Sequence, residues 1–344
     1  MAFTGLIIPL IGLQPAWTCL LALLGLLLLF IGFLWIKPVA SSPRKSNPHP
    51  AVSYEEALCR FDVMLQAERN NPELNPACHS KFLTHGGATE IAFMLYHGLT
   101  SCPEQFSALG RQLHEQGFNV FIPRLPVHGY ADRDVRHLAG LKVEALTSFV
   151  DQTIDIVSGL GKRVVLIGLS GGANLASWAA HTRTDVEAVV LLNPFYCIAQ
   201  VPAWLSKPVT NLGLLLPNMN FHTPDPGRST AGISILGLST RGEIQFMRLA
   251  AAILDMAKKR PPFVHRIGVL MVEDDPTVNN DRTRVLLALW SRYPEVTLFS
   301  QEFGKERGLP HDLIDPRNKR QQVDFVYPLI IDLAFRLLGD AGKT

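Results

Sequence analysis

The sequence is poor in cysteine, and its cysteines lack the spacing of a metal or redox site. Five cysteines are spread along 344 residues, and no two of them form a C-x-x-C pair. The common zinc and thiol-redox motifs are therefore excluded, and we expect no metal and no cofactor. An odd number of cysteines also does not indicate a disulfide framework. Cys78 and Cys102 flank the first predicted strands and could lie close together, but we favour ordinary buried thiols for both.

The chain also lacks a strong charge of either sign. Its 32 basic and 30 acidic side chains give a net charge of +2, and no stripe of basic residues is interleaved with aromatics. Proteins that bind nucleic acid usually carry such a stripe, so no nucleic-acid partner is expected. Hydrophobic residues make up 47% of the chain. The length suits one large α/β domain with room for an insertion.

Charge is wholly missing from the N-terminal segment. No charged side chain occurs from Met1 to Ile36, and Ala16 to Ile36 is an almost unbroken apolar run. A helix of about 20 apolar residues spans the hydrocarbon core of a bilayer. A cleaved signal peptide would have a basic start and a shorter apolar core. We therefore predict a single-pass membrane anchor over residues 1–37.

The residues that follow this anchor predict its orientation. Lys37, Arg44 and Lys45 come before any acidic residue. Because positive charge is retained on the cytoplasmic side, the rest of the chain is predicted to lie in the cytoplasm. Residues 38–52 are rich in Pro, Ser and Asn, which predicts a tether. Residues 53–344 are then the folded domain.

Within that domain, apolar runs alternate with helical patterns. Strands are predicted at Phe82–His85, Ile91–Tyr96, Phe118–Ile122, Arg163–Ile167, Val186–Leu192, Ile267–Val272 and Val296–Phe299. Helices are predicted at Val52–Asn70, Pro103–Gln116, Lys142–Ser158, Ala173–Ala180, Gly242–Lys259, Thr277–Trp290 and Lys319–Leu338. This alternation favours an α/β fold with a doubly wound, mostly parallel sheet. Gly86 and Gly87 predict a hairpin between the first two strands. The alternation stops over about residues 194–262, which predicts an inserted cap.

A glycine-rich turn joins one predicted strand to the next helix. Gly168-Leu169-Ser170-Gly171-Gly172 fits the G-x-S-x-G pattern of a nucleophile elbow. Glycines beside the serine permit a tight turn, which exposes the hydroxyl at the sheet's C-terminal edge. The adjoining helix N-terminus offers backbone N–H groups that stabilise an oxyanion. The alternative is an ordinary glycine-rich loop between a strand and a helix.

A serine nucleophile needs a histidine base and a carboxylate that orients the histidine. In folds with a nucleophile elbow, the acid follows the serine along the chain and the histidine follows the acid. His311 is the sole histidine after His265, and it follows the last predicted strand. Three acids end the preceding strand, namely Glu273, Asp274 and Asp275. We choose Asp275, because the next helix is predicted to start directly after it, and leave the other two open. One acid is expected to orient His311 while another caps the helix.

The oxyanion needs two backbone donors. Gly171 follows the nucleophile and supplies one N–H group. The other is expected from Leu99, in the loop after the first central strand. His97 is predicted to structure this loop by hydrogen bonding, and His128 to hold a loop near the site.

Five motifs occur together in one order. They are Tyr96-His97-Gly98-Leu99-Thr100, Arg124-Leu125-Pro126-Val127-His128-Gly129, Gly168-Leu169-Ser170-Gly171-Gly172, Asp275-Pro276-Thr277-Val278 and Pro310-His311-Asp312. Over roughly residues 80 to 340 the chain resembles the α/β-hydrolases, in particular the serine carboxylesterase and monoacylglycerol-lipase-like branch. The resemblance implies a Ser170–Asp275–His311 triad that hydrolyses esters or thioesters through an acyl-enzyme. The chain departs from the pattern at Val127, Val272 and Pro310, where relatives often have glycine.

These features predict a membrane-anchored serine hydrolase. The first part of the cap, from Phe195 to Leu216, is apolar. It favours a small-molecule ester of an apolar acyl group, or a lipid delivered from the bilayer. An equally favoured alternative is that these side chains only cover the sheet and bind no acyl group. Two rival functions are a non-catalytic binding protein on a hydrolase fold and an acyltransferase with the same triad.

Overall fold

The computed structural model of the chain describes residues 15–37, 46–222 and 232–339. Its strands are β1 (Lys81–Leu83), β2 (Thr89–Tyr96), β3 (Asn119–Ile122), β4 (Gly161–Leu169), β5 (Ala188–Leu192), β6 (Asn220–His222), β7 (Gly237–Ser239), β8 (Arg266–Val272) and β9 (Thr297–Phe303). Within this described part, seven strands form one sheet in the order β1-β3-β2-β4-β5-β8-β9, and β6 pairs with β7. Only β1 runs antiparallel to its neighbour in the large sheet. The predicted, mostly parallel sheet is confirmed.

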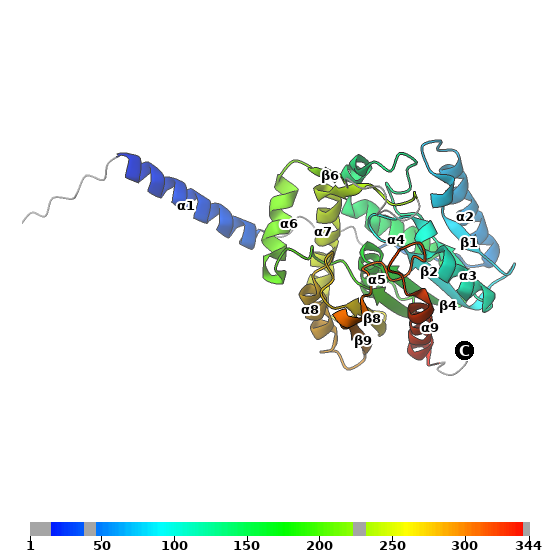
Figure 1. Cartoon of the computed structure of the whole chain (residues 1–344). Helices are drawn as coiled ribbons and strands as arrows, with labels where there is room; N and C mark the ends of the chain where they lie inside the picture. Colours follow the sequence, from blue (N-terminus) through cyan, green and yellow to red (C-terminus); the bar gives the residue numbers. More distant parts are fainter. Residues whose placement is uncertain (1–14, 38–45, 223–231, 340–344) are drawn as a thin grey trace, which may run out of the picture.

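Helices cover both faces of this sheet (Figure 1). The helices of the described residues are α1 (Pro15–Ile36), which projects away from the sheet, and α2 (Tyr54–Arg69), α3 (Ser107–Glu115), α4 (Val143–Val157), α5 (Gly171–Thr182), α6 (Ser206–Leu215), α7 (Thr240–Ala257), α8 (Asn280–Trp290) and α9 (Val323–Leu338). Alternate residues of β2 point to opposite faces. Phe93 and Leu95 join the core beneath α3 and α9, whereas Met94 and Tyr96 join the core beneath α4, α5 and α7. The sheet is therefore doubly wound, as predicted.

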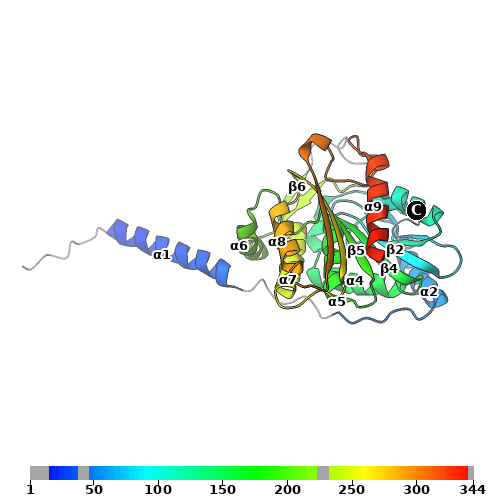
Figure 2. The ribbon, with the colours of Figure 1, turned by 90° about the horizontal axis from the view of Figure 1, so that it is seen from below.

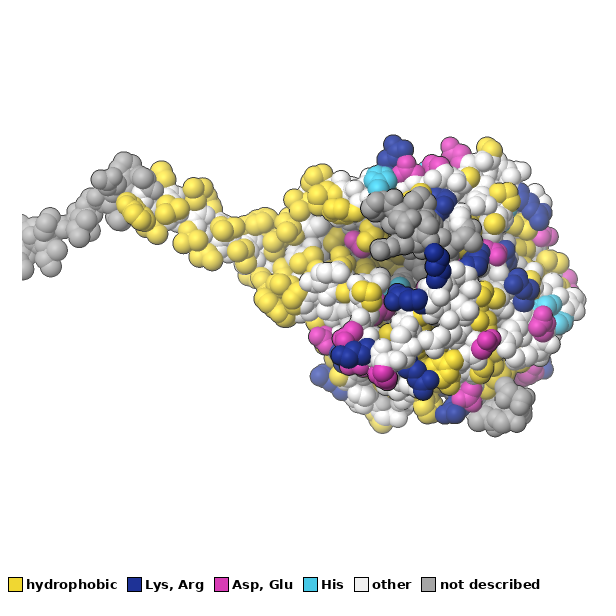
Figure 3. Space-filling model, in the orientation of Figure 1, with side chains coloured by type: hydrophobic (Ala, Val, Ile, Leu, Met, Phe, Trp, Pro, Cys, Tyr) yellow, Lys and Arg dark blue, Asp and Glu magenta, His cyan; other side chains and the backbone are white. Residues whose placement is uncertain are grey.

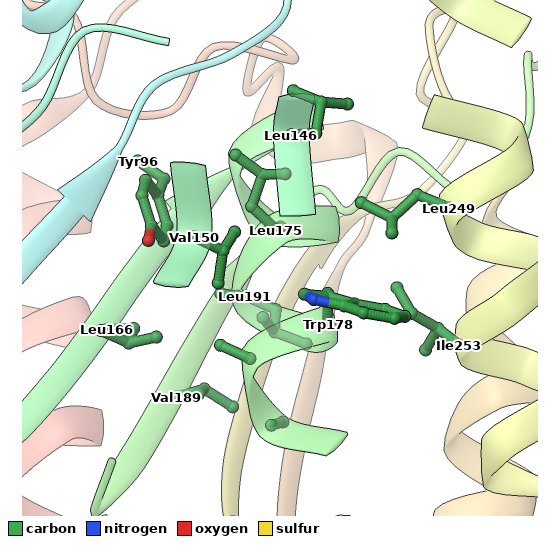
Figure 4. Close-up of a cluster of buried hydrophobic side chains, with 14 of the residues drawn as sticks. Tyr96, Leu146, Val150, Leu166, Leu175, Trp178, Val189, Leu191, Leu249 and Ile253 are labelled. Carbon is green, nitrogen blue, oxygen red and sulfur yellow. The ribbon is translucent and has the colours of Figure 1, made fainter. Parts of the chain in front are cut away.

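The core around α5 fixes the helix that begins beside Ser170. Trp178 of α5 lies between Val189 on β5 and Ile253 on α7 (Figure 4). Trp178 is 4% exposed, and both neighbours are fully buried. Burial of a large apolar side chain contributes about 1.5–3 kcal/mol. This packing holds α5 against the sheet and so holds the turn at its start.

The predicted hairpin around Gly86 and Gly87 is wrong. β1 pairs with β3, because β2 already has β3 on one edge and β4 on the other. The Asn119 side chain fastens the connection instead. It accepts a hydrogen bond from His85 N at 2.9 Å and donates to Gly87 O at 2.7 Å. The glycine pair turns the chain without pairing the strands on either side of it.

The expectation of ordinary thiols at Cys78 and Cys102 is also wrong, because these two residues form a disulfide. β1 runs antiparallel, so its first residue, Lys81, pairs with Ile122 at the C-terminal end of β3. Cys78 therefore lies at the same edge of the sheet as Cys102, which follows the end of β2. The antiparallel orientation of β1, which the predicted hairpin also implied, brings the two cysteines together, but the bond between them was not predicted.

The helix α1 ends against the cap and projects away from the body of the molecule (Figures 1 and 2). Residues Trp17–Ile36 have a mean hydropathy of 2.9, long and apolar enough to cross a membrane, a property that signal sequences share. Asn211 of α6 donates hydrogen bonds to Leu34 O at 2.9 Å and Lys37 O at 3.0 Å. The Trp35 ring stacks on Trp204 with centroids 5.8 Å apart. Helix α1 is thus joined directly to α6 and to the turn that precedes it.

The segment before α2 is fastened to α4. Ser46 Oγ donates a hydrogen bond to Asp151, and His49 N donates to Asp155 Oδ1 at 3.0 Å. The Ser53 side chain caps α2 by accepting from Glu56 N. The rest of the predicted tether, residues 38–45, lies outside the described residues, as do cap residues 223–231. The described end of the tether is therefore bound to the domain.

Candidate active site

Ser170 occupies a strained turn between β4 and α5. Its φ of 56° and ψ of −116° are unusual for any residue except glycine. Two backbone hydrogen bonds hold it there: Ser170 N donates to Leu192 O at 2.9 Å, and Phe195 N donates to Ser170 O at 3.1 Å. Such strain persists only where the surrounding structure enforces it, and it is concentrated at functional sites.

The neighbouring glycines are required by close packing. A Cβ on Gly172 would lie 2.0 Å from Tyr96 O, and a Cβ on Gly168 would lie 2.4 Å from the Gly172 carbonyl carbon. Neither position accepts a side chain without moving backbone. The glycines therefore allow α5 to start directly against β2 and β4, with Ser170 at the turn.

His311 and Asp275 are joined at the C-terminal edge of the sheet. His311 Nδ1 lies 2.6 Å from Asp275 Oδ2. Asp275 Oδ1 accepts from Thr277 N at 2.8 Å, so the same residue orients the histidine and caps the following turn. The expectation that two different acids share these tasks is wrong. The Asp275 side chain is fully buried, whereas that of Asp274 is 71% exposed.

The amides of Leu99 and Gly171 converge beside Ser170. A Cβ on Gly171 would lie 3.3 Å from Leu99 N, and a Cβ on Gly98 would lie 3.6 Å from Ser170 Cβ. Leu99 N donates to no other residue in the described part of the chain. Gly171 is the first residue of α5, where amides have no acceptor inside the helix. Two unpaired donors thus meet next to the hydroxyl.

Two buried histidines fix the loop that carries Leu99. His97 Nε2 accepts from Leu125 N at 3.1 Å, and its Nδ1 donates to Gly98 O at 2.9 Å. His128 Nε2 donates to Leu99 O. Burial lowers the pKa of His128 to about 4 and that of His97 well below its ordinary value, so both are neutral near pH 7. Their predicted structural roles are confirmed.

A cavity of about 440 Å³ brings these groups together. Ser170, His311 and Leu99 all line it. Its apolar wall is formed by Leu99, Leu169, Phe195, Ile198, Ile235, Leu236 and Leu238. Among the residues that the structure describes, no group of three or more His, Cys, Asp or Glu side chains is arranged to hold a metal ion.

A family model described as "Alpha/beta hydrolase family" matches residues 83–330. The chain belongs to the alpha/beta hydrolase family. No curated protein matches it by sequence. The Paleococcus ferrophilus monoacylglycerol lipase structure is 16% identical, has a TM-score of 0.55, and matches over 76% of this chain and 99% of its own. A soluble variant of Saccharomyces cerevisiae monoglyceride lipase, bound to a substrate analogue, is 13% identical, has a TM-score of 0.54, and matches over 77% of this chain and 92% of its own. These similarities confirm the predicted fold.

Two buried amides of this α/β-hydrolase were not identified from the sequence. Asn193 follows β5, donates to His311 O at 2.8 Å and accepts from Val272 N at 2.8 Å. Its position in the sequence, directly after a buried strand and before Pro194, could have identified it as a candidate at the sheet's C-terminal edge. Gln105 accepts from Gly98 N at 2.9 Å and donates to Asp312 Oδ2 at 2.8 Å. Nothing in the local pattern around Gln105 indicates that it joins the Leu99 loop to the His311 loop.

Proposed function

We propose that the chain is a serine hydrolase that cleaves carboxylic esters of apolar acyl groups. Ser170 is the nucleophile, His311 the base, and Asp275 the residue that orients His311. The amides of Leu99 and Gly171 form the oxyanion hole. The observation that carries the proposal is the 2.6 Å His311–Asp275 contact in the cavity that also contains Ser170. These are the groups that an activated serine requires, with the histidine–carboxylate contact already made.

In this reaction His311 Nε2 takes the Ser170 proton while Oγ attacks the acyl carbon. The negative oxygen of the tetrahedral intermediate is stabilised by the two amides. Protonated His311 then donates its proton to the leaving alcohol, and the acyl group stays on Ser170. A water molecule, deprotonated by His311, attacks this ester; His311 then returns the proton to Ser170 Oγ as the acid leaves. In the described residues Ser170 Oγ has no hydrogen bond to His311, so substrate binding must complete that contact.

The walls of the cavity support an apolar acyl group. Leu238 is both part of the cavity wall and 41% exposed on the cap surface. Other large apolar side chains are exposed on the cap near α1, namely Trp204, Leu215, Leu216, Met219 and Phe221. Figure 3 shows hydrophobic side chains covering α1 and continuing onto the adjoining face of the cap. With α1 in a bilayer, this face would lie at the membrane surface, which suits a lipid ester.

Two features of the chain favour opposite sides of the membrane for the folded domain. The basic residues after α1, of which Lys37 is described, favour the cytoplasm. The Cys78–Cys102 disulfide favours an oxidising compartment outside it. We give the disulfide more weight because the positive-inside preference depends here on only a few residues. The domain is therefore proposed to lie outside the cytoplasm, contrary to our expectation from the sequence.

A fluorophosphonate probe tests the nucleophile. We expect the probe to label the full-length protein and to label Ser170→Ala not at all, while exposed Ser291→Ala is labelled like the wild type. Asp275→Asn should lose far more activity toward p-nitrophenyl esters than Asp274→Asn. Labelling that persists in Ser170→Ala would refute the assignment.

Two rival functions give different results in the same assays. A non-catalytic binding protein would be inert toward the esters and unreactive to the probe. An acyltransferase would form an ester product when an acceptor alcohol is added, at the expense of the free acid. We expect the free acid to remain the main product.

A further inference from the structure

Glu243 lies in the wall of the active-site cavity, on the cap helix α7. Three residues further along the same helix, the Phe246 ring lies 3.1 Å from the position of a Cβ on Gly171. Residues three apart share a helix face and are separated by about 4.5 Å along the axis. Glu243 is therefore about one helical turn from the packing contact that covers the oxyanion hole.

Among the residues that the structure describes, the Glu243 carboxyl group has no partner. No described residue donates a hydrogen bond to it or forms an ion pair with it. It also does not cap α7, because the Ser239 side chain accepts from Gly242 N at that end. Burial alone raises its pKa to about 7, whereas a capping carboxylate would have a lowered pKa. Within the described part of the chain, neither a capping hydrogen bond nor an ion pair accounts for this residue of the first turn of α7.

Apart from His311, the ionisable side chains among the described residues of the cavity wall are acidic. The other carboxyl group in the wall, Asp312, is held by Gln105, and His311 is held by Asp275. No lysine or arginine is found among the described residues that line the cavity. An ionised carboxylate in a partly dry cavity is unfavourable until a cation or a strong donor pairs with it. Among the described residues of the wall none supplies a compensating positive charge, and a cationic ligand would supply it.

We propose that Glu243 is a specificity-determining residue that binds a positively charged ammonium group of the ester substrate. The proposal rests on the ester hydrolysis proposed above. The ammonium group pairs with the carboxylate while the ester reaches Ser170 and the apolar part packs on the cavity wall. The same carboxylate disfavours substrates that carry phosphate or sulfonate, including thioesters of phosphate-bearing carriers.

Ester pairs that differ only in charge test the proposal. Butyrylcholine is compared with 3,3-dimethylbutyl butyrate, in which carbon replaces the quaternary nitrogen. A second pair places the charge on the acyl side: the ethyl esters of 4-(trimethylammonio)butanoate and 5,5-dimethylhexanoate. For at least one pair, the wild type is expected to favour the cation in kcat/KM. Glu243→Gln should lower that ratio about tenfold, the effect of losing one charge-assisted contact.

Matched variants separate a charge effect from a structural effect. Glu243→Asp should keep part of the preference, because it keeps the charge. Asp255→Asn removes an exposed acid from the same helix and should leave both ratios unchanged. The anionic ester 3-sulfopropyl butyrate should be cleaved poorly by the wild type and better by Glu243→Gln. Opposite responses to cation and anion are not expected from a purely structural role.

The possible failures are distinguishable. If the wild type cleaves none of the esters, the proposed hydrolase function fails. If it cleaves the neutral esters but neither ratio depends on Glu243, only the ammonium site is overturned.

Discussion

Asn193 and His311 are joined by a 2.8 Å hydrogen bond from the Asn193 side-chain amide to the His311 carbonyl oxygen. The same side chain accepts from Val272 N, at the end of the strand that leads to Asp275. Asn193 thus sets the position of His311 relative to its orienting acid. We expect Asn193→Ala to lower kcat about 10- to 100-fold, because a misplacement of about 1 Å is sufficient for such a loss. KM should change much less. Steady-state kinetics on a p-nitrophenyl ester measure both constants.

Two further variants define the role of Asn193. Asn193→Asp keeps the acceptor for Val272 N but cannot donate to His311 O, so it should be impaired nearly as much as Asn193→Ala. Exposed Asn70→Ala should behave like the wild type. A fully active Asn193→Asp would show that the bond to His311 is not needed.

Much of this fold follows from local patterns. The buried apolar run of β2, Ile91–Tyr96, and the glycine turn around Ser170 are dictated by neighbours in the sequence, and both were predicted. His311 was found because the chain order of the catalytic groups leaves one candidate after the cap. The starts of α8 and α9 were predicted three to four residues too early, at Thr277 and Lys319 in place of Asn280 and Val323. Helix ends depend on caps such as Asn279, which accepts from Arg282 N.

The features that were missed depend on contacts between distant segments. The pairing of β1 is decided by which edges of β2 are already occupied, and periodicity does not contain that information. The disulfide was missed although its two cysteines could be expected to lie close together, because sequence proximity to the same sheet edge does not distinguish a bond from two thiols. Gln105 and Asp312 are 207 residues apart, and only the folded chain brings them together. Individual elements and the strained turn at Ser170 were therefore predictable, but the hydrogen-bond network that positions the residues around Ser170 was not.

The raised pKa of Glu243 predicts a pH-dependent gain in stability when this residue is neutralised. Its ordinary value is 4.5, and burial raises it to about 7 in the folded chain. The folded state holds the proton more tightly, so ionisation costs stability as pH rises from about 4.5 to about 7. We expect Glu243→Gln to match the wild type near pH 4 and to be more stable near pH 8, by at most about 3 kcal/mol. His311 and Asp312 also line the cavity, but both proteins contain them, so they do not account for the difference in stability.

Denaturant unfolding at several pH values measures this difference. Asp255→Asn serves as the control, since Asp255 is exposed and pairs with Lys258 at the surface. A gain that is equal at both ends of the pH range would contradict the pKa argument.

The Cys78–Cys102 disulfide closes a loop with a sequence separation of 24. A cross-link of this loop length restricts the unfolded chain and stabilises the fold by about 3 kcal/mol. The double variant Cys78→Ser/Cys102→Ser should therefore lose about that much free energy of unfolding. A reductant should lower the melting temperature of the wild type but not of the double variant. Cys59→Ser, at an exposed free cysteine, should respond to the reductant like the wild type.

The location of the domain is testable through the same two cysteines. Cells that express the full chain are quenched in acid, free thiols are blocked with N-ethylmaleimide, and disulfides are then reduced and labelled with a maleimide polymer. If the domain lies outside the cytoplasm, the wild type should gain two labels and the Cys78→Ser/Cys102→Ser variant none. Alkaline carbonate extraction of the same cells distinguishes an anchor from a cleaved signal sequence, since only an anchored chain stays with the membrane. A wild type whose five cysteines are all reduced in the cell would refute the proposed location and restore the cytoplasmic side favoured by Lys37, Arg44 and Lys45.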